Sequence, residues 1–153
     1  MPYFFYGTLM DKDVLEIVAG KKVLEKFISE GCLLGHERVY LKNLSYPALI
    51  TASQSSVRGV LYDGLDEYEV AKIMHFEGNQ MILKSLPIVV QTGESTGQSQ
   101  LAEVFYGEFG KELTDHIWSL EKWMKDEKAE YLRLARVWMQ YFGKSNQPNW
   151  EDL

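Results

Sequence analysis

The chain has 153 residues, of which 46% are hydrophobic and 13% aromatic, and its formal net charge is -6. A chain of this length and composition forms one folded domain with a full core, which excludes an intrinsically disordered protein. The acidic balance, without a block of Lys or Arg, disfavours binding to nucleic acid. The sequence has neither a signal pattern nor an apolar run near the roughly 20 residues that a membrane helix needs. We therefore expect a cytoplasmic protein that binds neither nucleic acid nor membrane.

The first half of the chain alternates strand and helix signals. Residues 2–6 predict a short apolar strand, and Asp11 and Asp13 predict the start of a helix that ends at Gly20. A strand-like pattern broken by Gly and Pro follows, up to the sequence VRGVLYDGL. Residues 66–78 carry apolar side chains at helical spacing, and Gly78 is typical of a helix C-terminal cap.

The second half begins with two further predicted strands, residues 81–91 and 101–109, on either side of a polar Gly- and Ser-rich loop. After Gly110 the pattern becomes helical. The predicted apolar stripes are Leu113, Ile117, Leu120 and Met124, and then Leu132, Ala135, Trp138, Met139 and Phe142. We expect one domain over residues 1–143, followed by a polar and loosely held tail over residues 144–153.

Six or seven short strands, one helix in mid-chain and a helical C-terminus indicate the α+β class. The alternating helices of a doubly wound parallel sheet are absent from this pattern. A curled or barrel-like sheet, antiparallel or mixed, is natural for so many short strands, because closure removes the exposed sheet edges.

Several kinds of chemistry find no support in the sequence. Cys32 is the sole cysteine, and we interpret it as a small apolar strand residue rather than a nucleophile. His36, His75 and His116 are far apart and lack the spacing of metal ligands. Glycine-rich phosphate loops and a Gly-x-Ser-x-Gly elbow are absent. We expect neither a metal nor a cofactor.

Two short segments remain as candidates for chemistry. The first, Tyr6-Gly7-Thr8-Leu9, lies between the first strand and the first helix, where backbone N–H groups can face an anion. The second is Glu77, at the negative end of the mid-chain helix, where an apolar pocket would raise its pKa and make it a proton shuttle near neutral pH. Taken alone, the first segment is better explained as an ordinary tight turn, and Glu77 is better explained as a solvated surface carboxylate.

Taken together and in order, the segments are more specific. The sequences YFFYGTLM, YPAL at residues 46–49, VRGVLYDGL and IMHFEG resemble the gamma-glutamylcyclotransferase-like (AIG2-like) superfamily. This resemblance covers roughly residues 2–110. It implies a small mixed β-barrel flanked by helices, and an activity that cyclises a γ-glutamyl group and releases 5-oxoproline. The substrate would be a γ-glutamyl amine or γ-glutamyl peptide, and no cofactor would be needed.

Position by position, the resemblance gives Glu77 the role of catalytic acid and base. It implies that the substrate-binding residues are Tyr6, Gly7, Thr8, Leu9, Tyr46 and Pro47. The sequence also departs from the family pattern. Met74, Met81 and Leu83 stand where the family usually has Asp, Tyr and Arg, and Phe105 aligns with a usual Tyr unless Tyr106 takes its place.

These departures leave three readings open. In the first, the chain is an active cyclotransferase with an altered specificity; in the second, it is a non-catalytic member that binds a small metabolite or a protein partner. In the third, it is an enzyme that uses the same pocket for another reaction, such as removal of an acyl group from an amine. Arg38 and Arg58 are further candidates, because either side chain would supply a positive charge to a substrate carboxylate. The oligomeric state is left open.

Overall fold

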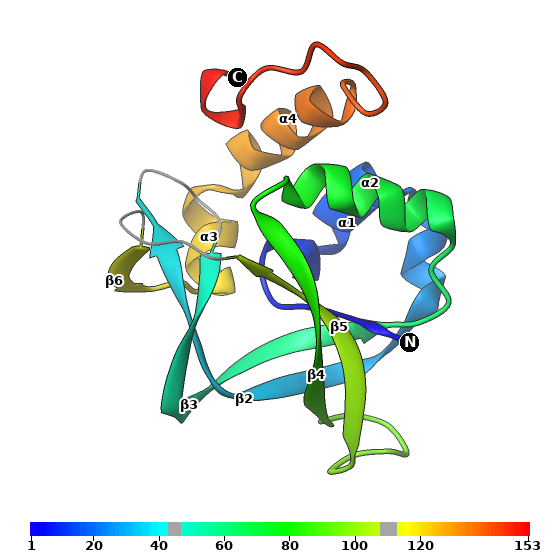
Figure 1. The fold of residues 1–153 in the computed structure, drawn as a ribbon, viewed down its shortest axis with the longest axis vertical. Coiled ribbons are helices and arrows are strands. Elements are labelled where there is room, and N and C mark those ends of the chain that lie inside the picture. The colour runs from blue at the N-terminus through cyan, green and yellow to red at the C-terminus, as the bar shows by residue number, and fades with distance from the viewer. Residues whose placement is uncertain (43–46, 108–112) are drawn as a thin grey trace.

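The structure is a computed structural model that describes residues 1–42, 47–107 and 113–153. In chain order its elements are the strand β1 (Tyr3–Phe5), the 3-10 turn η1 (Thr8–Met10), the helix α1 (Lys12–Ala19), η2 (Lys21–Lys26), β2 (Phe27–Leu41), β3 (Pro47–Tyr62), α2 (Glu67–Glu77), β4 (Met81–Val90), β5 (Ser99–Gly107), β6 (Leu113–Ile117), α3 (Leu120–Asp126), α4 (Lys128–Met139) and η3 (Trp150–Asp152). Strands and helices are thus grouped as the α+β class requires (Figure 1).

The strands close into a small barrel. Their order is β3-β1-β5-β4-β2, and β2 pairs again with β3, so that the ring of five has no free edge between its first and last strands. Strand β1 is parallel to β5 and antiparallel to β3, which makes the sheet mixed. The long β2–β3 pair carries two register shifts, between Phe27 and Ser29 and between Leu34 and His36, where bulges bend the strands as closure requires. The mixed barrel predicted from the sequence is confirmed.

The alternation of side chains along each strand divides the core into two parts. One buried cluster is built from all the strands of the ring and fills the barrel; its members include Phe4, Leu33, Val57, Leu61, Ile88 and Val104. The neighbouring side chain Phe5 points the other way and joins a second cluster. This second cluster lies between the barrel and the helices and includes Val14, Leu15, Ile73, Trp118, Trp123 and Tyr131.

The helices gather at one end of the barrel. Figure 1 shows α1, α2 and α4 together there, with the C-terminus beside α4, whereas the loop between β4 and β5 projects from the opposite end. The indole of Trp123 is fully buried in this layer. Among the described helices none is long and apolar enough to cross a bilayer.

The sequence prediction for the start of the C-terminal helical region was wrong. Residues Leu113–Ile117 form the strand β6, which pairs with β2 through Leu41↔Leu113 and Val39↔Ile117. The Thr114 hydroxyl also donates a 2.8 Å hydrogen bond to the Tyr40 carbonyl oxygen. Two apolar residues four positions apart fit one face of a helix and also one face of a strand, so the pattern alone did not separate the two.

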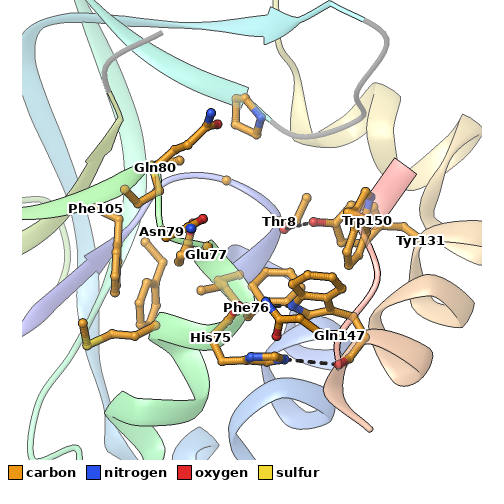
Figure 2. Close-up of a pocket in the computed structure, with 18 of the residues that line it drawn as sticks. Thr8, His75, Phe76, Glu77, Asn79, Gln80, Phe105, Tyr131, Gln147 and Trp150 are labelled. Carbon is orange, nitrogen blue, oxygen red and sulfur yellow. Dashed lines mark hydrogen bonds between the residues drawn. The ribbon is translucent and has the colours of Figure 1, made fainter. Parts of the chain in front are cut away.

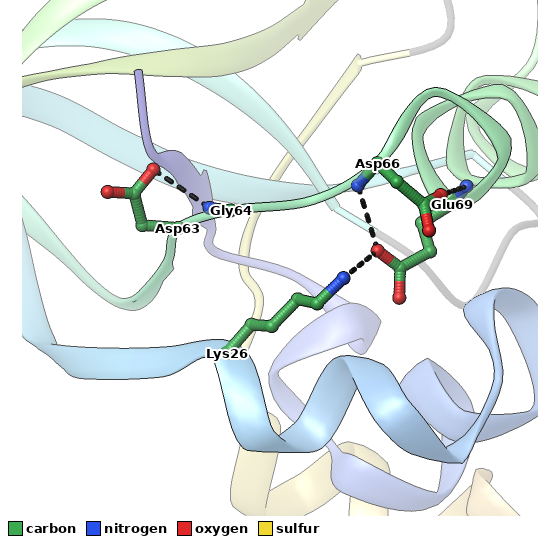
Figure 3. A network of polar contacts seen from close by, with 5 residues as sticks. All are labelled: Lys26, Asp63, Gly64, Asp66 and Glu69. Atoms are coloured by element: carbon green, nitrogen blue, oxygen red, sulfur yellow. Dashed lines mark hydrogen bonds and ion pairs between the residues drawn. The ribbon is translucent and has the colours of Figure 1, made fainter.

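A polar network fixes where α2 begins. The Asp66 carboxylate accepts from the Glu69 backbone N–H at 2.7 Å, while the Glu69 carboxylate accepts from the Asp66 N–H at 2.9 Å (Figure 3). This reciprocal cap satisfies two of the backbone donors that a helix N-terminus leaves free. Lys26 forms an ion pair with the buried Glu69 carboxylate and so joins the cap to η2.

Candidate functional site

The segment Tyr6-Gly7-Thr8-Leu9 forms a single tight turn between β1 and α1. The Met10 N–H donates to the Gly7 carbonyl and the Asp11 N–H to the Thr8 carbonyl, both at 3.0 Å. The Asp11 side chain then caps α1 by accepting from the backbone of its first turn. The N–H groups of Gly7, Thr8 and Leu9 donate to no residue within the described part of the chain. They are available to an acceptor on a ligand.

Arg38 stabilises the backbone of this turn. Its guanidinium donates to the Tyr6 carbonyl oxygen at 2.6 Å and to the Arg58 carbonyl at 3.2 Å, and it lies over the Trp118 ring at 5.0 Å. In a trans peptide the C=O and N–H groups point in opposite directions, so the Gly7 N–H points away from Arg38. Arg38 and Arg58 do not line the cavity described below. The Arg38 guanidinium instead donates hydrogen bonds to backbone carbonyl groups.

Side-chain hydrogen bonds fix the turn to two other elements. The buried Tyr6 hydroxyl donates to the Phe105 carbonyl oxygen of β5 at 2.6 Å. The Thr8 hydroxyl donates to the Tyr131 hydroxyl of α4 at 3.1 Å. Gly7 itself lies against Pro47, because a Cβ atom at this position would be 3.1 Å from the proline ring. Both ends of the turn are therefore held by residues that are distant in sequence.

Glu77 is the last residue of α2, and its position is set by the end of that helix. Gly78 stops the helix with φ of +87° and ψ of 169°, a conformation that is essentially restricted to glycine. Two residues before Glu77, His75 stacks on Trp138 of α4 and exchanges two hydrogen bonds with it. The His75 ring nitrogen lies 3.2 Å from the Trp138 carbonyl, and the Trp138 indole N–H donates to the His75 carbonyl at 3.1 Å.

These elements enclose a cavity of about 860 Å³ between the barrel and the helices (Figure 2). The site residues predicted from the sequence that line it are Tyr6, Gly7, Thr8, Leu9, Pro47 and Glu77. The remaining one, Tyr46, lies outside the described residues. In Figure 2 the Glu77 side chain lies between Phe105 on one side and Trp150 on the other. The fold thus brings together two segments that are 70 positions apart in the sequence.

The environment of Glu77 changes its ionisation. The residue is half-buried, and the removal of its carboxyl from water raises its pKa from 4.5 to about 7. No side chain within the described ranges forms an ion pair or hydrogen bond with this carboxyl. The Tyr6 pKa is raised well above its usual value, first by burial and then by the charge of Glu77, so Tyr6 stays neutral. At neutral pH, Glu77 is poised both to accept and to donate a proton.

The departures from the family pattern fall on the apolar walls of the cavity. Met74, Met81 and Phe105 line it, while Leu83 packs against the core cluster behind it. Phe105 therefore stands at the cavity position where the family usually has Tyr. The Tyr106 ring instead packs against the barrel cluster, with the Lys84 ammonium 4.2 Å from its centroid. No group of three His, Cys, Asp or Glu side chains suited to a metal occurs in the described part of the chain.

The sequence reading missed two contributions from the C-terminal third. Tyr131 of α4 is buried, lines the cavity and contacts Thr8. The segment 147–151 lines the cavity, with the Trp150 indole packed against Phe76 at 6.1 Å between ring centroids. The available signal was the single Trp in an otherwise polar tail, because a large apolar side chain there has to be buried somewhere.

Comparison with known families now identifies the fold. The family model described as "Gamma-glutamyl cyclotransferase, AIG2-like" matches residues 3–125. The chain belongs to this family. The matched region extends from β1 to α3 and includes the turn at Tyr6–Leu9 and Glu77. The segment 147–151 lies beyond it. The resemblance drawn from the sequence motifs is confirmed at the level of the family.

Solved structures share the fold at low sequence identity. A protein of Arabidopsis thaliana, studied in solution, matches 96% of this chain and 94% of its own with a TM-score of 0.60 and 19% identity. A protein named gamma-glutamyl cyclotransferase matches 97% of this chain and 88% of its own, with a TM-score of 0.62 and 11% identity. An uncharacterized protein from Homo sapiens matches 99% of this chain and 95% of its own, with a TM-score of 0.60 and 10% identity. No curated protein matches the sequence significantly.

Proposed function

We propose that the chain is a cyclotransferase that acts on a γ-glutamyl amine or γ-glutamyl peptide and releases 5-oxoproline. The observation that carries this proposal is the Glu77 carboxyl, with a pKa of about 7, in the same cavity as the backbone N–H groups of the Tyr6–Leu9 turn. A proton shuttle and a set of anion-binding donors are what an intramolecular acyl transfer requires.

The reaction joins the substrate's own α-amine to its γ-carbonyl carbon and breaks the bond from that carbon to the leaving amine. Glu77 takes a proton from the attacking α-amine and gives a proton to the leaving nitrogen, so the carboxylate is regenerated in each cycle. Attacking and attacked groups belong to one molecule, and holding that molecule in a bent conformation supplies much of the rate advantage. Contacts with the cavity wall have to keep the bound substrate in this bent conformation.

The Tyr6–Leu9 turn supplies the stabilising donors in this scheme. The N–H groups of Gly7, Thr8 and Leu9 would hold the α-carboxylate or the carbonyl oxygen as negative charge develops on it. Arg38 and Tyr131 keep the turn in place, through the Tyr6 carbonyl and the Thr8 hydroxyl. A fixed arrangement of donors costs no reorganisation during the reaction, which is why their rigidity contributes to the rate.

The test is the release of 5-oxoproline from a panel of γ-glutamyl amino acids, γ-glutamyl amines and glutathione. We expect Glu77→Gln to lower kcat by about a thousandfold while the fold and ligand affinity are retained. The matched control is Glu67→Gln, an exposed carboxylate at the other end of the same helix, which should keep full activity. Equal turnover by Glu77→Gln and the wild type would remove Glu77 from the mechanism.

Two methionines in the lining favour one alternative, a non-catalytic protein that binds a small metabolite or a protein partner. Met74 and Met81 line the cavity where the family pattern has polar residues, which removes groups that would position a charged substrate. This alternative predicts that calorimetry detects tight binding of a γ-glutamyl compound to the wild type, without any product. Under this alternative the Glu77→Gln variant would also bind the compound tightly and form no product.

A further inference from the structure

The C-terminal segment 147–151 forms one wall of the cavity. Its residue Trp150 packs its indole against Tyr131 at 5.3 Å, Trp138 at 5.8 Å and Phe76 at 6.1 Å between ring centroids. Figure 2 shows Trp150 beside Tyr131, and Gln147 close to His75. These ring contacts fasten the segment to α2 and α4, which carry the three partner rings. A side chain on this segment is therefore held at a definite place beside the cavity.

The cavity wall is acidic. Its charged lining residues are Glu77 and Glu151, and neither Lys nor Arg occurs among the described residues that line it. Glu151 follows Trp150 directly, is exposed, and belongs to the fastened segment. The C-terminal end of α2, which carries a partial negative charge, also faces the cavity at Glu77 and Gly78. A positive group is favoured here and a negative group is disfavoured.

The volume of the cavity leaves room for more than a γ-glutamyl group, since cavities of this size hold drug-sized ligands. Thr8, in the turn assigned to the glutamyl end, contacts Tyr131, and Tyr131 contacts Trp150. The glutamyl site and the C-terminal segment are thus joined through one side chain. Glu77 and the segment 147–151 line the same cavity, so a leaving amine that extends from Glu77 on this side would meet the segment.

We propose that the segment 147–151 forms the leaving-group side of the site. Glu151, held there by Trp150, is a specificity-determining residue that selects γ-glutamyl substrates whose leaving amine carries a second positive charge, such as a diamine. This inference rests on the proposed cyclotransferase function. It adds to that function the charge of the preferred leaving group and the residues that choose it.

Three substrates of similar length test the charge preference. They are the γ-glutamyl derivatives of 1,4-diaminobutane, butylamine and 4-aminobutanoate, whose leaving groups end in a cation, a methyl group and an anion. We expect kcat/KM to fall in that order, by about threefold to tenfold from the first to the last, with a smaller spread in 0.5 M salt. Glu151→Lys should lower or invert the ratio of the cationic to the anionic substrate.

A second charge reversal provides the control. Glu94→Lys changes the net charge equally but lies in the loop between β4 and β5, at the opposite end of the barrel (Figure 1), and should leave the ratio unchanged. Trp150→Ala should reduce the ratio towards one, because the segment loses its anchor, whereas Trp150→Phe should restore most of it. A thermal unfolding curve for each variant shows whether the fold is intact.

The outcomes separate the inference from the function on which it rests. Release of 5-oxoproline without any dependence on leaving-group charge, or a ratio unmoved by Glu151→Lys, overturns the inference and leaves the cyclotransferase standing. If none of the three substrates releases 5-oxoproline, their binding to the wild type is measured by calorimetry. The same charge order in affinity then retains the role of Glu151 in a binding protein, and no order overturns it.

Discussion

The Arg38 guanidinium and the Tyr6 carbonyl oxygen are joined by a 2.6 Å hydrogen bond that connects β2 to the end of β1. Burial lowers the Arg38 pKa somewhat, and the side chain stays charged at any physiological pH. A hydrogen bond from a charged donor is among the stronger ones in a protein, which suits a contact that orients the peptide between Tyr6 and Gly7.

Arg38→Met tests this positioning role, since methionine keeps an apolar stem but provides no donor. We expect the unfolding free energy to fall by about 1–3 kcal/mol and KM for a γ-glutamyl substrate to rise by about tenfold. Urea unfolding and steady-state kinetics measure the two effects. The control Arg133→Met removes an exposed ion pair with Glu130 and should change stability by less than about 0.5 kcal/mol. Unchanged KM in Arg38→Met would contradict the role.

The raised pKa of Glu77 predicts how stability depends on pH. Between about pH 4.5 and 7 the folded chain binds a proton that the unfolded chain has lost, so the unfolding free energy falls as pH rises through this range. Above pH 7 the unfolding free energy is lower by at most about 3.5 kcal/mol, and by less where water still reaches the half-buried carboxyl. Urea midpoints at pH 5 and pH 8 should differ less in Glu77→Gln than in the wild type. An equal pH dependence in both would contradict the raised pKa.

The same pKa predicts the pH dependence of turnover. The carboxylate form has to accept the proton from the attacking amine, so kcat/KM should rise with pH with an apparent pKa of about 7. The measurement is a pH profile of 5-oxoproline release at low substrate concentration. A rise centred near pH 4.5, the ordinary value of a Glu side chain, would show that the carboxyl stays solvated in the working site.

The contact between Thr8 and Tyr131 predicts an energetic coupling between the turn and α4. A double-mutant cycle with Thr8→Val and Tyr131→Phe removes each hydroxyl and then both, and should give a coupling of about 0.5–1.5 kcal/mol in unfolding free energy. The unrelated pair Thr8→Val and Thr96→Val serves as control, because Thr96 bonds within its own loop, and should show additivity. Additivity in the first pair as well would mean that the hydroxyls do not interact.

The backbone conformation of Gly78 predicts that a side chain at this position lowers the stability of the fold. Its φ of +87° and ψ of 169° are unfavourable for residues with a Cβ atom, so Gly78→Ala should lower the unfolding free energy by about 1–3 kcal/mol. Thermal or urea unfolding measures this effect. Asn79→Ala, at the next and exposed position, should have an effect below about 0.5 kcal/mol. Similar stabilities of the two variants would argue against strain at the end of α2.

The sequence by itself determined the features that depend on neighbouring residues. The capping pair Asp66 and Glu69 and the stop at Gly78 define α2, and α2 places Glu77 at its end. Motif order was enough to indicate the family and the barrel, which the structure and the comparisons confirm. The extent of the helical C-terminus was not determined, because Leu113 and Ile117 satisfy both periodicities and only pairing with β2 selects the strand.

Tertiary structure alone decided the surroundings of the site. Arg38 contacts Tyr6 across 32 positions and Thr8 contacts Tyr131 across 123, and no local pattern encodes such distances. The attachment of Trp150 depends on rings from α2 and α4, two helices that are far apart in the sequence and meet only in the folded chain. The pKa of Glu77 likewise reflects the removal of water by residues from several elements, because desolvation is a property of the assembled cavity and not of the chain around one residue.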